Sequence, residues 1–578
     1  VYTSVKDVDD VDIKYGRVSA LFAPNDVFSA QLSYQRQDDE VGGRRQVTSG
    51  EDLVNGGQYG KYEFGGVQLE PAERDVELTA LELEFDLGFA TLTSSTSYYE
   101  HTGSGISDNS GVYARNGWFA FYGSSPRPIA QAERFYDDSA VVQELRLVSG
   151  GDGRVDWTAG FFYMDQDYDL GQNSYLVGYI PFLDALNWYG LAPYETNQDF
   201  LFRRSQTYEE MALFGEVTFD LSDTVHLTVG GRYFDNEVDV DAVVDVPIYA
   251  VFAPPGTASE TISDDDILAK ANLAWDLGGN SMVYLTYSQG YRHAGANAVP
   301  TTGKYAENPD FFTFDADSLD NYELGYKGSN DRMTWAVSLY FDDWKDPQLN
   351  TATSNWGFFA AINGESAESK GVEIELSGLL GEHFTYSFGY TYADSQLTAD
   401  VYQPAGNFYG GPLYTDRVGA DGDRLPGSAE HVVTASLRHD MTFDNGIELS
   451  TVLSAYYQSE ISNSLGDDVC LTEFNAIGNC RDSPNPTSAF YAPLSVFSRS
   501  FAEVDGFDLW NLSMTASKDG WTGSLYVKNL FNEEGTTGVF PFLVGGSQTD
   551  PSQNYFGNNS RALIALPRTI GVTLGYRF

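Results

Sequence analysis

Hydrophobic and polar residues alternate with a period of two along most of the chain. Between Val225 and Tyr233 the odd positions carry Val, Leu, Val, Gly and Tyr, whereas the even positions carry His, Thr, Gly and Arg. The same split occurs over residues 384–392 and again over residues 570–578. Because successive side chains of a strand point to opposite faces, this pattern predicts strands with one apolar and one polar face.

Nineteen such segments are found, and the connections between them alternate strictly between short turns and long loops. The segments start near Lys14, Asp26, Glu73, Gly88, Asp138, Arg154, Gln206, Asp223, Asp265, Ser281, Asp317, Asp331, Ser366, Glu382, Ser428, Gly446, Asp505, Gly520 and Arg568. The nine long loops lie roughly at 38–72, 102–137, 169–204, 242–261, 293–316, 343–365, 396–427, 461–504 and 532–566. All short turns therefore belong to one end of the sheet and all long loops to the other.

This segregation of connections is typical of a barrel in a bacterial outer membrane, where periplasmic turns are short and extracellular loops are long. A soluble β-sandwich gives no reason for it. In lipid all backbone polar groups must be paired, so the strands have to close on themselves. We therefore expect an all-β fold, a transmembrane antiparallel β-barrel in the outer membrane with about nineteen strands in this chain.

The composition agrees with a large β protein. The 578 residues include 83 acidic and 33 basic side chains, a formal charge of −50, which argues against a nucleic-acid partner. Hydrophobic residues make up 42% of the chain, too many for a disordered segment. No run reaches the roughly 18 to 20 apolar residues that a membrane helix needs.

The number of strands is itself informative. Single-chain bacterial barrels have an even number of strands with both termini in the periplasm. With nineteen segments, the first one runs downward from the exterior while the last one ends on the periplasmic side. We therefore expect that an odd number of strands precedes Val1 and that residues 1–578 are part of a longer barrel.

Several short motifs in order resemble the TonB-dependent outer-membrane receptors, in the subgroup common in sphingomonads and marine bacteria. They are Gln143 to Leu147, Gly230 to Tyr233, Tyr284 to Arg292, Asn321 to Lys327, Gly371 to Glu375, Arg424 to Gly427, Val527 to Phe531 and Pro567 to Phe578. The resemblance implies a 22-stranded barrel around a plug. By this comparison the plug domain, three strands and the segment that contacts the TonB-type energy transducer lie upstream of Val1.

The polar faces of the predicted strands carry charges of both signs. The residues expected to face the lumen and the plug are Glu144, Arg146, Arg232, Arg292, Glu323, Lys327, Glu373 and Glu375. Paired charges of this kind suit the docking of a plug. A wet lumen, or the constriction of a porin, is the alternative interpretation.

The long loops are rich in aromatic residues, which offer flat apolar surfaces for ligands. The residues expected to bind a ligand are Trp118, Phe119, Trp188, Tyr189, Trp356, Phe358, Tyr409 and Tyr491. The alternative is that these side chains only pack the loops against one another. The function that follows is ligand-gated import of a scarce solute such as a siderophore, an oligosaccharide or another nutrient; the alternative is a passive diffusion channel.

Cys470 and Cys480 are the only cysteines and lie in one extracellular loop, where a disulfide is favoured over two free thiols.

Acidic clusters such as Asp342-Asp343 are interpreted as solvated surfaces, with calcium binding as the alternative. No cofactor or resident metal is expected. The sequence lacks His-Glu-x-x-His, Gly-x-Ser-x-Gly and phosphate-loop motifs, so an enzyme is not expected.

The chain ends on an aromatic residue, Phe578, after an alternating strand. By resemblance, such a terminal segment is recognised by the barrel-assembly machinery. The alternative is one more aromatic residue in the girdle that contacts outer-membrane lipid.

Overall fold

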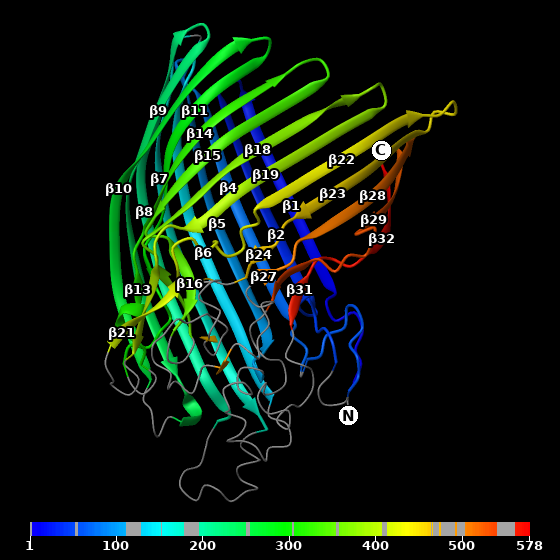
Figure 1. Ribbon diagram of the computed structural model, residues 1–578. Coiled ribbons are helices and arrows are strands. Elements are labelled where there is room, and N and C mark those ends of the chain that lie inside the picture. Colours follow the sequence, from blue (N-terminus) through cyan, green and yellow to red (C-terminus); the bar gives the residue numbers. More distant parts are fainter. Residues whose placement is uncertain are drawn as a thin grey trace, which may run out of the picture.

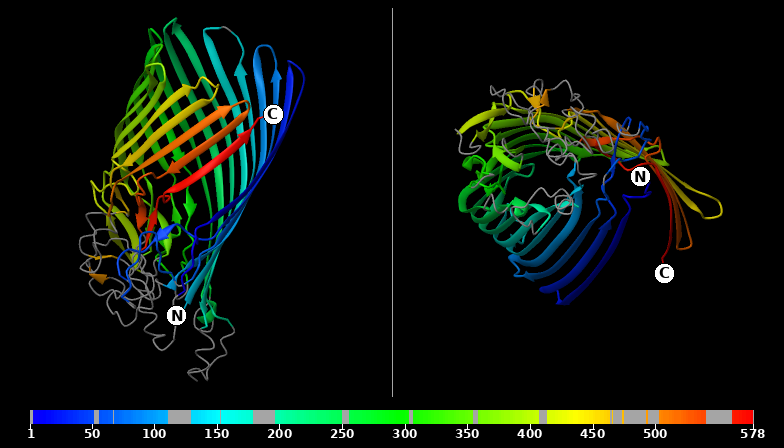
Figure 2. Two further views of the ribbon diagram at one scale, coloured as in Figure 1. Left: turned by 90° about the vertical axis from the view of Figure 1, so that its right-hand side faces the viewer. Right: turned by 90° about the horizontal axis from the view of Figure 1, so that it is seen from below.

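We describe the fold from a computed structural model. It describes residues 3–51, 56–66, 68–110, 129–151, 153–178, 196–249, 255–302, 306–353, 358–406, 413–463, 465, 473–474, 492–493, 503–539 and 561–577. One antiparallel sheet of 19 strands dominates the structure and curls into an incomplete cylinder (Figures 1 and 2). Within the described residues no helix is both long and apolar enough to cross a membrane.

The sheet confirms the nineteen predicted strands one for one, and each strand pairs with its neighbours in sequence order. They are β1 (Val11–Asn25), β2 (Phe28–Val41), β4 (Ala72–Asp86), β5 (Ala90–Asp108), β6 (Ile129–Ser149), β7 (Val155–Val177), β8 (Gln198–Ser222), β9 (Val225–Asp245), β10 (Gly256–Gly278), β11 (Ser281–Arg292), β14 (Asp317–Ser329), β15 (Met333–Lys345), β18 (Ser366–Leu380), β19 (Phe384–Leu397), β22 (His431–Thr442), β23 (Glu448–Gln458), β28 (Phe507–Lys518), β29 (Trp521–Lys528) and β32 (Thr569–Tyr576). In the described part of the chain, β1 pairs only with β2 and β32 only with β29. The cylinder is therefore open between these two edges (Figure 2, right).

Short strands and two 3-10 turns fold the long connections at one end of the sheet. They are β3 (Gln46–Val47), β12 (Gly295–Ala296), β13 (Thr313–Phe314), β16 (Gln348–Ala352), β17 (Phe359–Asn363), β20 (Val401–Gly406), β21 (Leu413–Gly419), β24 (Ile461–Ser462), β25 (Glu473–Phe474), β26 (Ala492–Pro493), β27 (Glu503–Val504), β30 (Thr536–Val539), β31 (Ala562–Ile564), η1 (Pro247–Tyr249) and η2 (Pro309–Phe311). In Figure 1 these elements lie at the bottom and the short turns at the top, as the alternating loop lengths predicted.

In the turn-proximal half of each strand, which we call the lower half although Figure 1 draws it at the top, the two faces differ as expected for a membrane barrel. On β9, Val229 and Tyr233 point outward and are 47% and 42% exposed, while His226 and Arg232 alternate with them on the inner face. Outward apolar side chains continue across the neighbouring strands, for example Leu213 and Ile267. This outward apolar surface is the part of the sheet that lies in lipid.

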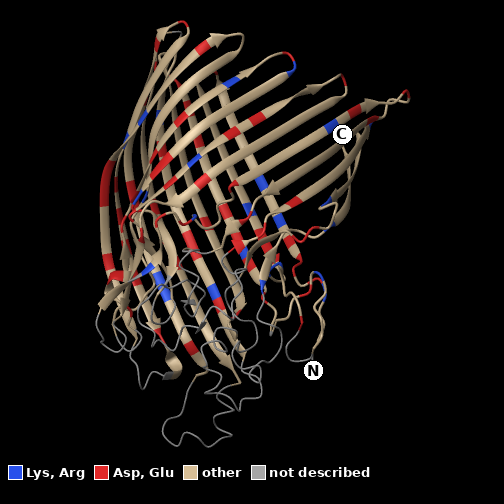
Figure 3. Ribbon diagram, in the orientation of Figure 1, with Lys and Arg blue, Asp and Glu red and all other residues tan. Residues whose placement is uncertain are grey.

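The loop-proximal half of β9, which we call its upper half, shows the opposite polarity, which the alternation did not predict. Beyond Tyr233, the inward side chains Phe234, Val238 and Val240 are at most 1% exposed, whereas Asp239 and its outward neighbours are exposed carboxylates. Acidic residues are accordingly abundant on the loop-proximal ends of the long strands, which Figure 3 draws at the bottom. The inner face is apolar here because loops pack against it.

This switch of phase explains where the predicted boundaries were wrong. The expected starts near 138, 206 and 265 lie inside strands that begin at Ile129, Gln198 and Gly256. A single alternation cannot be followed through a point where the apolar face changes sides. The upper strand halves were therefore assigned to the long loops.

The core of the loop end is a cluster of buried apolar residues from several connections. It includes Phe311, Leu349, Ile362, Leu397 and Val401, with Trp344 and Leu425 packed against it. A second cluster joins Val238 and Val240 to Phe312. The long loops thus form a packed cap, and this cap defines the mouth of the barrel.

Candidate ligand-binding site

Strand register places seven of the eight side chains predicted to face the lumen on the inner face, and Arg292 lies there through its contacts with Asp317 and Trp344. Arg232 pairs with Glu210 and lies 4.9 Å from the ring centroid of Phe162. Glu144 and Arg146 approach to 3.7 Å. These charges are therefore already paired within the barrel wall.

The remaining members of this set have partners of other kinds. Glu323 accepts a hydrogen bond from Tyr284, and Lys327 lies 5.5 Å from the same ring. Ser338 lies 3.5 Å from Glu373, and Glu375 is paired in register with Ala336 on β15. The inner wall is thus a network of charged and hydroxyl groups; its contact with a plug stays a prediction.

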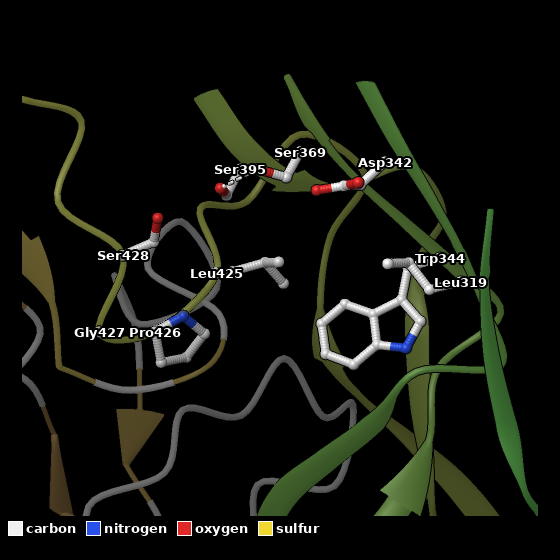
Figure 4. A pocket seen from close by; sticks show the side chains of 9 residues that line it. All are labelled: Leu319, Asp342, Trp344, Ser369, Ser395, Leu425, Pro426, Gly427 and Ser428. Atoms are coloured by element: carbon white, nitrogen blue, oxygen red, sulfur yellow. Dashed lines mark hydrogen bonds between the residues drawn. The ribbon is translucent and has the colours of Figure 1, made fainter. Parts of the chain in front are cut away.

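A cavity of about 440 Å³ opens in this inner wall just below the cap (Figure 4). One side is formed by inward residues of four adjacent strands, and the other by the segment that follows β21. The lining residues are Leu319, Asp342, Trp344, Ser369, Ser395, Leu425, Pro426, Gly427 and Ser428. Its volume lies in the range of small-molecule sites in proteins.

Trp344 is held in place by two contacts. Its indole Nε1 donates to Oδ2 of Asp317 at 3.0 Å, and the guanidinium of Arg292 lies 5.0 Å from its ring centroid. Arg292 in turn pairs with Asp317, which is 4% exposed. The predicted lumen residue Arg292 therefore positions the aromatic wall of the cavity.

The polar side of the cavity comes from one row of the sheet, in which Asn321, Asp342, Ser369 and Ser395 are register partners. The amide of Asn321 donates to Oδ1 of Asp342 at 2.7 Å. The hydroxyls of Ser369 and Ser395 are 2.7 Å apart. A carboxylate and two hydroxyls thus lie together above the indole ring.

The opposite wall is the motif Arg424 to Gly427, and backbone hydrogen bonds fix its path. The Leu425 nitrogen donates to the Ser395 carbonyl at 3.0 Å, and the Gly427 nitrogen donates to the Ser462 carbonyl at 2.8 Å. Gly427 has φ of 78°, a conformation that glycine adopts without strain. Figure 4 shows Leu425 pointing across the cavity toward Trp344.

A second region of the mouth is basic instead of acidic. Arg561 is 6% exposed and pairs at 2.5 Å with Glu70, which also accepts from Gln46. Nearby, Arg44 donates to the Ser107 hydroxyl and Arg134 donates to the Gln172 side-chain oxygen. Burial, and then the charge of Arg44, lower the pKa of Arg134.

The pair Arg561–Glu70 ties the first long loop to the last one. The backbone of β3 joins β31 and β30 in a three-stranded sheet at the same place. Burial opposes ionisation of Glu70, but the charge of Arg561 and three hydrogen bonds outweigh it and lower its pKa. We call these residues and strands the clasp.

Of the aromatic residues predicted to bind ligand, Phe358 is described: it stacks on Phe200 with centroids 5.8 Å apart and packs against the cap. The other seven lie outside the described residues, as do the predicted disulfide and the C-terminal assembly residue; these are Trp118, Phe119, Trp188, Tyr189, Trp356, Tyr409, Tyr491, Cys470, Cys480 and Phe578.

Sequence reasoning missed the cavity residues Asp342, Trp344, Ser369 and Ser395. Asp342 was noted only as half of an acidic pair with Asp343. On a strand the two carboxylates point to opposite faces, so they cannot share a calcium ion, and the alternative calcium interpretation of this pair is wrong. The available signal was that both Asp342 and Trp344 fall on the inward phase near the loop end of their strand.

Comparison with known proteins agrees with this architecture. The family model described as "TonB dependent receptor-like, beta-barrel" matches residues 10–530. A pesticin receptor of Yersinia enterocolitica is 25% identical over 260 residues, which cover 45% of this chain and 34% of that receptor. A ferric-pyoverdine 358 receptor of Pseudomonas putida is 25% identical over 183 residues, 31% of this chain and 20% of the receptor. The matches thus span about a third or less of the relatives' own length.

Solved structures share the fold. The ferric yersiniabactin uptake receptor FyuA from Yersinia pestis superimposes with a TM-score of 0.69 at 16% identity, covering 98% of this chain and 71% of FyuA. The siderophore receptor PiuA from Acinetobacter baumannii gives 0.65 at 14% identity, with 98% and 74% covered. The chain therefore belongs to the TonB-dependent receptor-like β-barrel family and is an outer-membrane barrel.

Proposed function

We propose that the protein is a ligand-gated, active importer of the outer membrane that takes up a scarce solute. The observation that carries this proposal is the cavity at Trp344, which lies on the inner wall of the mouth, below a packed cap of extracellular loops. Membership in a family of transport receptors supports it. It is further supported by relatives named as receptors for pesticin and ferric pyoverdine and by the similar fold of a ferric yersiniabactin uptake receptor.

The chain would supply the barrel part of this importer. We propose that residues 1–578 are a partial barrel domain, and that a plug, three strands and a segment for a TonB-type energy transducer precede them. The inward charges at Arg146, Arg232 and Lys327 would then face the plug. The sphingomonad and marine subgroup, assembly through the terminal strand and contact with outer-membrane lipid belong to the same proposal.

In this mechanism the chain performs recognition and no bond is made or broken. A solute entering the mouth exchanges water for the apolar faces of Trp344 and Leu425 and for hydrogen bonds to Asp342. Release requires the plug to move when the transducer pulls on it. Ligand binding at the mouth and energy input at the periplasmic side are therefore separate events.

Uptake measurements test the proposal. Cells are grown on candidate iron and carbon sources, and accumulation of the inducing solute is compared between wild type, a deletion of the receptor and a deletion of the transducer. We expect both deletions and a protonophore to abolish accumulation. Accumulation that persists without the transducer, together with a steady conductance of the purified protein in planar bilayers, would identify a passive channel instead.

A further inference from the structure

We propose that the cavity at Trp344 binds an uncharged, polyhydroxylated ring, such as one unit of a neutral oligosaccharide. The inference rests on the proposed import function and adds the chemical class of the solute. It follows from three properties of the cavity: an apolar aromatic wall, a facing row of hydroxyl and carboxylate groups, and the absence of a cation among the lining residues that the structure describes.

The aromatic wall offers only apolar surface. The indole N–H of Trp344 already donates to Asp317, so it is not available to a ligand. The guanidinium of Arg292 lies over the ring and fixes its position. Leu319, Leu425 and Pro426 extend this surface. A sugar ring has one face made of C–H groups, which packs well on such a surface.

The polar row supplies both donors and acceptors. Asp342 uses Oδ1 for Asn321, so its carboxylate retains further acceptor capacity toward the cavity. The paired hydroxyls of Ser369 and Ser395 can each donate or accept. Hydroxyl groups around the edge of a sugar ring need this mixture, whereas a plain aromatic ligand would leave the further donor and acceptor capacity of these groups unused.

The charge of the cavity selects against anionic chelates. Asp342 is the one charged side chain among the described lining residues, and the guanidinium of Arg292, which contacts the Trp344 ring, is neutralised by Asp317. An anionic iron complex placed here would face an uncompensated carboxylate. The guanidinium groups of Arg44, Arg134 and Arg561 belong to the separate basic region of the mouth.

The test uses the complete receptor purified in detergent and a printed array of neutral and acidic oligosaccharides, with ferric citrate as a competitor. We expect binding to at least one neutral oligosaccharide, weakened at least about tenfold by Trp344→Ala and retained within about threefold by Trp344→Phe. Trp335→Ala, on the outer face of the same strand, is the matched control and should leave affinity unchanged. Far-ultraviolet circular dichroism checks that each variant keeps its β structure.

Two results would overturn the inference. One is an array on which no neutral oligosaccharide binds in a Trp344-dependent way. The other is ferric citrate or an acidic glycan binding in a Trp344-dependent way, more tightly than any neutral glycan. Either result leaves active import standing if uptake still requires the transducer, whereas transducer-independent accumulation would remove the proposed function itself.

Discussion

In the two halves of strand β9, the apolar side chains lie on opposite faces of the sheet. In the lower half, the apolar residues Val229 and Tyr233 face outward and the inner face is polar. In the upper half, Val238 and Val240 face inward and are fully buried, while Asp239 faces outward into water. This difference indicates that lipid contacts the outer face of the lower half, whereas loops cover the inner face of the upper half.

Each half is consequently stabilised in a different way. The lower half is held by backbone pairing and by contact with lipid, so a charge on its outer face is costly. The upper half has an inner core like that of a soluble protein, so a charge is costly on its inner face or where an ion pair is buried. The same kind of substitution at matched positions should therefore have a different cost in stability in the two halves.

The largest expected effect is the loss of the buried pair in the clasp. Glu70→Ala leaves the guanidinium of Arg561 buried without its carboxylate, and we expect a loss of about 3–5 kcal/mol in the stability of the clasp. The double variant Glu70→Leu/Arg561→Met should recover most of it. Limited proteolysis of residues 56–66 under increasing urea measures the effect.

The exposed pair Lys14–Glu40, at 3.3 Å, is the control for this experiment. Glu40→Ala should change protease resistance very little, because water screens an exposed pair. Since the pKa of Glu70 is lowered in the folded protein, the contribution of its pair should be present at neutral pH and disappear as the pH falls below the ordinary carboxyl range. Equal effects of both variants would contradict a packed upper half.

The next prediction compares the effects of an arginine substitution at two outward positions of β9. Val229→Arg places a charge in the lipid-facing surface and should cost about 2–4 kcal/mol. Asp239→Arg, ten residues further along the same face, should be tolerated because that position lies in water. Heat-modified mobility of the protein in outer-membrane extracts reports both variants. If Asp239→Arg were as damaging as Val229→Arg, the boundary between the halves would be misplaced.

A buried carboxyl near the start of β8 gives a pH-dependent prediction. Asp199 is 5% exposed, its Oδ1 has no hydrogen-bond partner within the described residues, and burial raises its pKa to about 7. Folding therefore favours the protonated form, so the stability of this segment should fall as the pH rises from about 4 to about 7.

Asp199→Asn should remove this pH dependence. Above pH 7 the variant should be more stable than the wild type by on the order of 2 kcal/mol, because local opening limits the full cost of the charge. Hydrogen exchange of β7 and β8 at pH 5 and pH 8 measures it. Identical pH profiles of the two proteins would show that the carboxyl is solvated.

The smallest effect concerns the outward carboxylates of the upper half. Asp165, Glu209 and Glu237 are register partners on three adjacent strands and repel one another. Raising the salt concentration from low to physiological should increase the melting temperature by about 1–2 °C. Glu209→Gln should remove part of this salt dependence, and Leu213→Ala, on the lipid-facing half of the same strand, should leave it unchanged.

The sequence allowed prediction of much of the fold because strand alternation and loop length are local signals. All nineteen strands, the inward phase of residues such as Arg232 and the end at which loops gather followed from them. The upper halves were not predicted, since the apolar face changes sides between Tyr233 and Phe234. The residues of a single strand do not indicate whether a loop that is distant in sequence will cover its inner face.

The candidate site was predictable only in part, for the same reason. The motif Arg424 to Gly427 was found as a family resemblance, but its role as a wall of the cavity depends on Trp344, about eighty residues earlier. Asp342 and Ser369 become neighbours through strand register, and their adjacency is a product of the sheet. Phe358, expected to bind ligand, has its described ring contacts within the cap.

Spin labels along β9 test the central claim most directly. Single cysteines, introduced after Cys470 and Cys480 are replaced by serine, carry nitroxides from residue 227 to residue 241 of the receptor in lipid bilayers. We predict that labels at outward positions up to Tyr233 are accessible to oxygen. Labels at the outward positions from Asp235 to Asp241 should be accessible to a water-soluble nickel chelate. Inward labels at Val238 and Val240 should be inaccessible to both reagents. Oxygen accessibility that continues outward to Asp241, or free access of the chelate to Val238, would contradict the account.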